Sequence, residues 1–256
     1  MKKEVVLRNF SKYAESYNAH STVQKECAKK LLGMVCPEKF RNILEIGCGT
    51  GFYTKMLSER YPYARITAID ISPEMINSAK KERVCRNVKF KILDAEKMLL
   101  EQKFDLITSN ASFQWFENVG LLVKHLGGML NPGGFFCFSI YGRETFIELE
   151  QVLNLYWGIE NMLSSSRFVS DEIILKAMKD CFKDVYLESR IFKVRFNSLL
   201  DFLREIKFSG CRGEGLKNQR FFGKNMLRDL EKLYQDKFDG ITATHHVVFY
   251  SAKRDE

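Results

Sequence analysis

A strand-like run that ends in three alternating glycines constrains this chain more than any other part of its sequence. The run Ile43 to Ile46 is followed by Gly47-Cys48-Gly49-Thr50-Gly51, and a helix is expected from Phe52 to Arg60. Glycines at such a junction let backbone approach a ligand closely at the carboxyl edge of a parallel sheet. The spacing is not the Gly-x-Gly-x-x-Gly of dinucleotide enzymes, and no Gly-Lys-Ser/Thr follows as in phosphate-binding loops. The segment therefore predicts a nucleotide-like cofactor.

Strand-length apolar runs alternate with helix-length amphipathic stretches through the first 141 residues. This alternation is typical of βαβ units and predicts an α/β fold around a parallel sheet. Five strands are expected, at 43–46, 65–69, 88–92, 104–109 and 134–141. Further helices are expected from Ser72-Pro73-Glu74 to about 83, and at 118–129 before the turn Asn131-Pro132-Gly133-Gly134.

The remaining segments are expected to flank and cap this sheet. A helix at 22–34, preceded by the aromatic segment 10–17, predicts a flap over a site. Later helices are expected at 145–156, 171–181, 199–208 and 224–237, with a strand pair near 185–196 and a last strand at 242–252. Because no linker or repeat intervenes, we expect one domain over 1–256. Its parts are a helical flap (1–36), a cofactor-binding core (37–142), a cap insertion with late core elements (143–240) and the last strand (241–256).

Composition excludes several classes of protein. Hydrophobic residues at 45% with 16 glycines and 4 prolines exclude a disordered or fibrous chain, and no apolar stretch approaches a membrane span of roughly 18 residues. Seven scattered cysteines without a Cys-x-x-Cys pair argue against a disulfide framework or zinc ribbon, and the four histidines lack metal-ligand spacing. We therefore expect no metal, no membrane association and a cytoplasmic protein with free thiols.

The net charge of +8 favours an acidic partner without choosing among nucleic acid, an anionic metabolite and an acidic protein. A merely solvated surface explains it equally well. Lysines and arginines are interspersed with acidic residues and form no dense arm, which argues against nucleic acid.

Three carboxylates at predicted strand ends narrow the cofactor. Glu45, just before the glycines, would repel a pyrophosphate but suits a cation such as an amino-acid ammonium. Asp70 lies about 20 residues beyond the loop, where a carboxylate accepts bonds from ribose hydroxyls. Asp94 ends the third strand and can receive the exocyclic amine of adenine. An amino acid joined to adenosine is S-adenosylmethionine, so this is the predicted cofactor, with S-adenosylhomocysteine as product.

The chain resembles the class I S-adenosylmethionine-dependent methyltransferases in four segments that lie in order at predicted strand ends. They are Leu44 to Gly51, Ala68 to Met75, Asp94 to Glu96, and Leu130 to Gly134. The resemblance implies a Rossmann-like α/β fold whose seven-stranded, mostly parallel sheet has an antiparallel last strand, with a helical cap insertion added. It also implies cofactor contacts from Gly47, Gly49, Gly51, Ile71, Met75, Ala95 and Asn110.

A narrower resemblance, to the malonyl-acyl-carrier-protein O-methyltransferase family of biotin biosynthesis, covers nearly the whole chain. It rests on Asn9 to Asn18 with Val23-Gln24, on Ser109 to Trp115, and on Leu203 to Gly210. The segment Cys211 to Glu214 departs from the usual family pattern. Related methyltransferases of small acids share the block from Asn110 to Trp115, so a free acid such as aconitate stays open as the substrate. RNA methylation, and cofactor binding by an accessory subunit without turnover, stay open as functions.

A carboxylate acceptor needs no general base, because it is already ionised at pH 7. We therefore expect residues that position and shield it. Arg204 is the predicted partner of the substrate carboxylate, with Arg143 in reserve. Tyr17 and Gln24 are expected to close over the methyl donor, Asn110 to offer its carbonyl to the methionine part, and Gln114 and Trp115 to wall the transfer site. An acidic acyl-carrier protein is expected to dock on basic cap residues, which are Lys207, Arg212, Lys217, Arg220 and Lys224.

Overall fold

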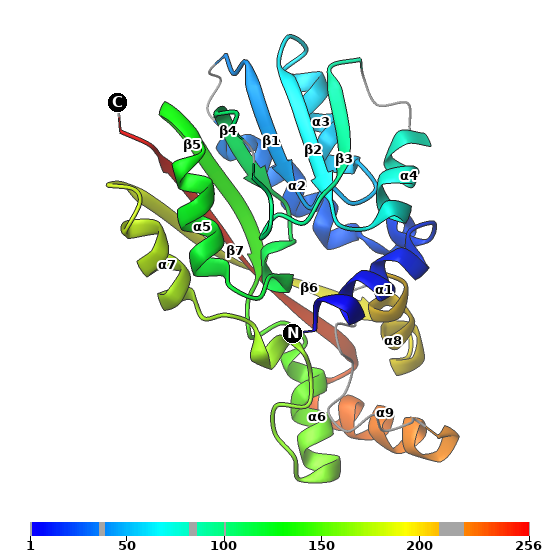
Figure 1. Cartoon of the computed structure of the whole chain (residues 1–256). Coiled ribbons are helices and arrows are strands. Elements are labelled where there is room, and N and C mark those ends of the chain that lie inside the picture. The colour runs from blue at the N-terminus through cyan, green and yellow to red at the C-terminus, as the bar shows by residue number, and fades with distance from the viewer. Residues whose placement is uncertain (1, 36–38, 82–85, 100, 210–222, 256) are drawn as a thin grey trace.

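Seven strands form one sheet in the order β3-β2-β1-β4-β5-β7-β6 (Figure 1). The computed structural model describes residues 2–35, 39–81, 86–99, 101–209 and 223–255. The strands are β1 (Asn42–Ile46), β2 (Arg65–Asp70), β3 (Val88–Ile92), β4 (Phe104–Ser109), β5 (Leu130–Tyr141), β6 (Val185–Phe196) and β7 (Ile241–Lys253). Strands β1 to β5 pair in parallel, whereas β7 runs antiparallel to both of its neighbours. The predicted sheet with an antiparallel last strand is confirmed.

Helices cover both faces of the sheet and form a cap beside one end of it (Figure 1). The α-helices are α1 (Lys3–Tyr13), α2 (Thr22–Met34), α3 (Phe52–Arg60), α4 (Pro73–Lys81), α5 (Val119–Gly128), α6 (Ile147–Trp157), α7 (Asp171–Lys179), α8 (Leu199–Phe208) and α9 (Lys224–Phe238). Three 3-10 turns are η1 (Tyr17–His20), η2 (Phe113–Trp115) and η3 (Ser165–Arg167).

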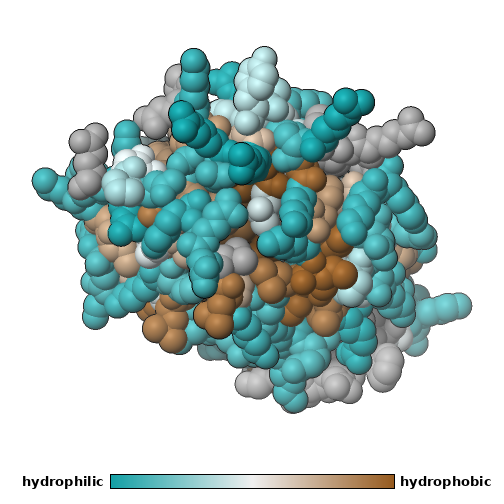
Figure 2. All heavy atoms as spheres, turned by 45° about the horizontal axis from the view of Figure 1, so that its top comes forward, coloured by the Kyte–Doolittle hydropathy of each residue, from teal (hydrophilic) through white to brown (hydrophobic). Residues whose placement is uncertain are grey.

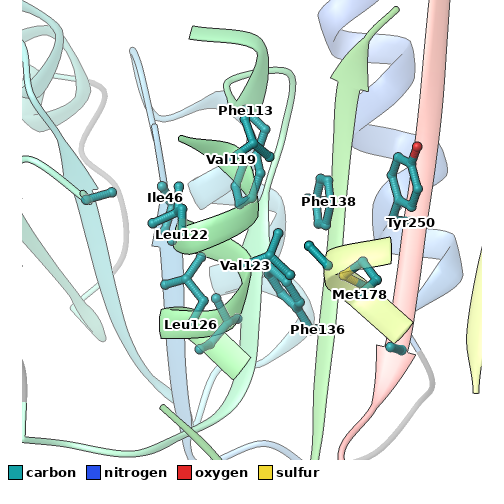
Figure 3. Packing of buried hydrophobic residues seen from close by; sticks show 14 of the residues in the cluster. Ile46, Phe113, Val119, Leu122, Val123, Leu126, Phe136, Phe138, Met178 and Tyr250 are labelled. Carbon is teal, nitrogen blue, oxygen red and sulfur yellow. The ribbon is translucent and has the colours of Figure 1, made fainter. Parts of the chain in front are cut away.

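The core lies on the two faces of the sheet. On one face α5 and α7 pack on β1, β5 and β7, where Leu122 lies beside Ile46 and Met178 lies by Phe138 and Tyr250 (Figure 3). On the other face α2 and α3 bury a second cluster of apolar side chains. Among the described residues, no helix combines the length and apolar character that crossing a membrane requires. Figure 2 shows one face of the molecule, where polar side chains surround a central apolar area.

Local capping explains where several helices begin. The Ser72 hydroxyl accepts a 3.2 Å hydrogen bond from Met75 N, as predicted for the start of α4. The side chain of Asn118 caps α5 by accepting from Leu121 N at 3.0 Å. Gly51 precedes α3 with a φ of +86°, a left-handed conformation that favours glycine. The residues at which α3, α4 and α5 begin are therefore determined by local sequence.

Two expectations after residue 129 were wrong. The segment 185–196 is one continuous strand instead of a strand pair, because it has no turn residues and pairs along its whole length with β7. The predicted turn at 131–134 lies within β5, which begins at Leu130 and shifts register against β4.

The cap has an apolar cluster of its own. Side chains of α6, α8 and α9 pack together with Ile241 and Ala243 at the start of β7. In contrast, α7 and β6 belong to the sheet. The cap therefore packs against the end of the sheet at which β7 begins.

Candidate cofactor and transfer site

A cavity of about 780 Å³, counting its open mouth, is lined by residues at or just after the ends of β1 to β4 and by residues of α1. Its described lining is Lys3, Val6, Leu7, Phe10, Tyr17, Ile46, Gly47, Gly49, Ile69, Asp70, Ile71, Ser72, Met75, Leu93, Asp94, Ala95, Asn110, Ala111, Ser112, Trp115 and Phe116. Ligands of open α/β sheets bind at this carboxyl edge. The cavity is the candidate cofactor site.

The glycine loop lies beside this cavity in a conformation that needs glycine. Gly47 has a φ of +66°, and a Cβ there would lie 2.5 Å from Ser112 Cβ. Gly49 has a φ of +54° and lines the cavity, and a Cβ there would meet no atom within 4 Å. The open space over Gly49 lets a ligand reach the backbone. Gly51 does not line the cavity, and its role is to begin α3.

Asp70 holds the loop to the next strand. Its carboxylate oxygens accept 2.9 Å hydrogen bonds from Gly49 N and Ser72 N. Burial raises the pKa of Asp70, and the backbone hydrogen bonds partly oppose this shift. Because the carboxylate also lines the cavity, it is placed to accept ligand hydroxyls.

Glu45 lies beneath the loop, with 1% of its surface exposed. Its Oε2 atom has no hydrogen-bond partner among the described residues. Burial, followed by the negative charge of Asp70, raises the pKa of Glu45 to about 8. Glu45 does not line the cavity, but a buried, unsatisfied carboxyl oxygen next to it fits a cationic ligand group. The carboxylates of Asp70 and Glu45 can accept hydrogen bonds from ligand hydroxyls and balance a positive charge. Together with the space over Gly49, they fit a ligand that carries both.

One cation lines the cavity within the described ranges. Lys3 Nζ, at the start of α1, lies 2.9 Å from Asp94 Oδ2 and 2.6 Å from Glu96 Oε2. Asp94 also binds the backbone by accepting from Glu96 N at 3.0 Å. The sequence predicted a ligand amine at Asp94 and did not anticipate Lys3 there.

Aromatic side chains wall the other end of the cavity, beyond β4. The Trp115 ring lies edge-on to Phe10 from α1, with centroids 5.7 Å apart, and edge-on to Phe168 at 5.6 Å. Tyr17 lies against Phe10, with centroids 6.2 Å apart. This end is apolar and is covered by the predicted flap.

The loop after β4 is tied down by side chains. Ala111 has a φ of 51°, and its N–H donates to Ser139 Oγ at 2.9 Å. The Asn110 amide donates to the carbonyl of Gln24 at 2.9 Å, and its Oδ1 accepts from Ser139 Oγ. These bonds fix the loop between α2 and β5, so Gln24 supports the site from behind through its backbone.

The flap also contacts the cap. His20 Nδ1 lies 2.6 Å from Glu205 Oε2 on α8, and the His20 ring stacks on Phe208 with centroids 5.2 Å apart. Tyr13 lies edge-on to the same Phe208 ring at 5.6 Å. We call these four residues the flap–cap seam. It joins the helix that roofs the cavity to α8.

The structure brings most of the predicted site residues together. Those that line the cavity are Tyr17, Gly47, Gly49, Asp70, Ile71, Met75, Asp94, Ala95, Asn110 and Trp115, and those that do not are Gln24, Glu45, Gly51, Gln114, Arg143 and Arg204. Gln114 is buried and donates to the carbonyl of Ala111 at 2.7 Å. Lys3, Val6 and Leu7 were missed, although the apolar residues of 5–10 lie at helical spacing.

The two predicted substrate arginines differ in their surroundings. Arg204 lies on the outer side of α8 with 58% of its side chain exposed, and its Nη1 is 3.4 Å from Asp201 Oδ1. Arg143 Nε donates to the carbonyl of Phe168 at 2.7 Å, and the Phe168 ring contacts Trp115. Arg143 is thus connected to the cavity wall through one residue. Of the predicted docking cations, Arg212, Lys217 and Arg220 lie outside the described residues, whereas Lys207 and Lys224 are exposed.

Comparison with known folds agrees with this architecture. The YcgJ protein from Bacillus subtilis aligns with a TM-score of 0.61 and 15% identity, covering 90% of this chain and 99% of that one. Haemonchus contortus phosphoethanolamine N-methyltransferase 2, solved with S-adenosyl-L-methionine, aligns with a TM-score of 0.62 and 17% identity, covering 96% of this chain and 57% of that one. At these identities the likeness shows the fold.

Sequence comparison identifies the family. Residues 44–138 match the family described as "Methyltransferase domain". Malonyl-[acyl-carrier protein] O-methyltransferase 2 of Ilyobacter polytropus is 35% identical over 253 residues, covering 96% of both chains. The malonyl-[acyl-carrier protein] O-methyltransferase of Acetivibrio thermocellus is 34% identical over 268 residues, covering 98% of this chain and 94% of that one. The similarity to these relatives extends over the flap, the core and the cap, and the cavity lies at the glycine loop. The chain therefore belongs to the malonyl-[acyl-carrier protein] O-methyltransferase family.

Proposed function

We propose that this enzyme transfers a methyl group from S-adenosylmethionine to the free carboxylate of malonyl-acyl-carrier protein. The products are the malonyl methyl ester and S-adenosylhomocysteine. The observation that carries the proposal is the 35% identity to the Ilyobacter polytropus enzyme. The aligned region covers 96% of this chain and includes both the flap and the cap. A chain that shared only the cofactor core would support methyl transfer without a substrate class.

Different residues of the site are proposed to bind different parts of the cofactor. S-adenosylmethionine supplies an electrophilic methyl group on a positively charged sulfur when it is bound. Asp70 is proposed to accept the ribose hydroxyls, Asp94 the adenine amine, and Glu45 to balance the ammonium from beneath the loop. Gly49 leaves the backbone open to the methionine part. These tasks follow the order of β3, β2 and β1 along the sheet edge.

The aromatic end of the cavity suits the transfer step. A negative oxygen meets a positive sulfonium, and both charges diminish as the methyl group moves, so an apolar enclosure favours the transition state over the separated ions. Phe10, Tyr17 and Trp115 provide that enclosure. Because the acceptor is ionised at neutral pH, no general base is proposed.

The substrate arm is proposed to enter between the aromatic wall and the cap. Arg143 and Arg204 are the proposed partners of the malonyl carboxylate. Arg143 is favoured by its hydrogen bond to Phe168, which packs on Trp115. The carrier protein is proposed to dock on the basic cap. The methyl ester would serve the early steps of biotin biosynthesis, in the cytoplasm, where thiols such as Cys27 and Cys137 stay free.

The test is transfer of labelled methyl from S-adenosylmethionine to malonyl-acyl-carrier protein, in parallel with malonyl-coenzyme A, free malonate, aconitate and bulk RNA. Label in the malonyl carrier, alone or together with malonyl-coenzyme A, supports the proposal. Label only in a free acid or in RNA contradicts it and leaves the cofactor site intact. Asp70→Asn is the matched inactive control, and cofactor binding without transfer to any acceptor would indicate a subunit without turnover.

A further inference from the structure

The first residue of α1 makes a two-carboxylate contact at the edge of the cofactor cavity. Lys3 Nζ lies 2.6 Å from Glu96 Oε2 and 2.9 and 3.1 Å from the two oxygens of Asp94. The Lys3 side chain is 19% exposed, and the side chains of Asp94 and Glu96 are 16% and 14% exposed. An ion pair that is this shielded from water is screened much less than a surface pair.

This contact holds the roof of the cavity. Val6, Leu7 and Phe10 of α1 line the cavity together with Lys3, so the helix lies over the ligand space. Farther along α1, Ser11 Oγ lies 3.0 Å from Ser72 Oγ, beside the carboxylate of Asp70. These two contacts fasten α1 to the cavity edge at both ends of the helix.

The geometry leaves room for a ligand amine at Asp94. The shortest contact of Lys3 is with Glu96, whose Oε1 accepts separately from Asn118 N at 2.8 Å. Glu96 is therefore held in place from α5 and forms an ion pair with Lys3, whereas both hydrogen bonds of the Lys3 ammonium go to Asp94. Both Asp94 oxygens accept from Lys3, and Oδ1 also accepts from Glu96 N, so Oδ2 keeps a lone pair for an exocyclic amine.

We propose that Lys3 is a positioning residue that latches α1 over the adenosine end of the bound cofactor by bridging Asp94 and Glu96, with Asp94 shared with the cofactor. The inference rests on the proposed cofactor site. Lys3 makes no contact with the reacting atoms, and it acts by keeping the roof helix closed. Its loss should shorten the residence of the cofactor without altering the transfer step itself.

The experiment measures S-adenosylhomocysteine dissociation from the full-length protein by stopped-flow displacement. Lys3→Met keeps an unbranched side chain one atom shorter and removes its charge, and Glu96→Gln keeps an oxygen for Asn118 N. Lys3→Met should accelerate dissociation roughly tenfold, since its charged hydrogen bonds to Asp94 are lost, and Glu96→Gln should accelerate it less, since those bonds remain. The double variant should be little worse than Lys3→Met alone, because that single change already removes the ion pair with Glu96.

Two control variants make the result specific. Lys12→Met removes a lysine of the same helix whose Nζ lies over the Tyr13 ring, with no carboxylate within ion-pair distance among the described residues, and it should release product at the wild-type rate. Lys3→Arg should restore most of the retention. Unchanged dissociation in Lys3→Met, or tighter binding, overturns the latch while the cofactor site stands. Failure of the wild type to bind S-adenosylhomocysteine overturns the proposed cofactor and the latch with it.

Discussion

At the scale of single residues, Glu45 is the most unusual group of the site, because a buried carboxyl oxygen without a partner is costly. In the folded protein its pKa is raised to about 8, so between its ordinary value and pH 8 the folded state keeps a proton that the unfolded state has lost. The free energy of unfolding therefore falls as pH rises through this window. Asp70, whose pKa is also raised, adds in the same direction.

We predict that Glu45→Gln flattens this pH dependence in thermal unfolding of the ligand-free protein. Because a cofactor ammonium favours the charged carboxylate, cofactor affinity of the wild type should rise as pH increases towards 8. The Glu45→Gln variant should bind more weakly and lose that rise. Calorimetric titration at several pH values measures both effects. An affinity that falls with rising pH in the wild type would exclude the proposed role of Glu45.

The two candidate arginines can be separated by substitution. Arg143→Ala should raise the KM for malonyl-acyl-carrier protein roughly tenfold, with cofactor affinity near that of the wild type, because the substrate carboxylate loses a charged hydrogen-bond partner beside Phe168. Arg204→Ala should have a smaller effect, since its guanidinium faces Asp201 at the surface. Steady-state kinetics with both variants decides the matter. The opposite ranking would restore Arg204 to the role predicted for it.

At the scale of elements, the flap–cap seam determines how the roof of the cavity meets α8. Phe208 contacts both Tyr13 and His20, and Glu205 lies 2.6 Å from His20. The same α1 whose residues line the cavity is therefore anchored on the helix that carries Arg204. Movement of α8 on carrier docking would be transmitted to the flap through these contacts.

Removing the Phe208 ring should loosen the flap. We predict that Phe208→Ala increases hydrogen exchange of residues 3–20 and raises the KM for the carrier substrate several-fold, because two ring contacts are lost. Leu200→Ala is the matched control, since Leu200 is exposed on the same helix. If hydrogen exchange increased only in α8 and not in residues 3–20, the flap–cap seam would not couple α8 to the flap.

At the scale of the whole molecule, the net charge of +8 suits an acidic carrier protein. Lys207 and Lys224 are exposed on the described part of the cap. We predict that the KM for malonyl-acyl-carrier protein rises between low and moderate ionic strength, whereas the KM for malonyl-coenzyme A, which lacks the protein surface, changes less. Kinetics at fixed pH and varied salt checks this. A KM for the carrier substrate that is insensitive to salt would rule out electrostatic docking.

The positions of the first five strands, the glycine loop and the carboxylates at the strand ends were predictable, because each depends on local patterns of a few residues. Gly47, Gly49, Asp70 and Asp94 all line the cavity for this reason. The strand pair near 185–196 was mispredicted because the length of β6 is determined by its partner β7, which lies far along the chain.

Sequence by itself determined the fold class, the cofactor edge and the family of this protein, since periodicity and motif spacing are written along the chain. Only the tertiary structure decided which side chains from distant segments of the chain contact each other. Lys3 reaches Asp94 and Glu96 through the packing of α1 over the sheet, and His20 reaches Glu205 through the placement of the cap. Contacts between segments this far apart depend on the assembled core, and no local pattern specifies them.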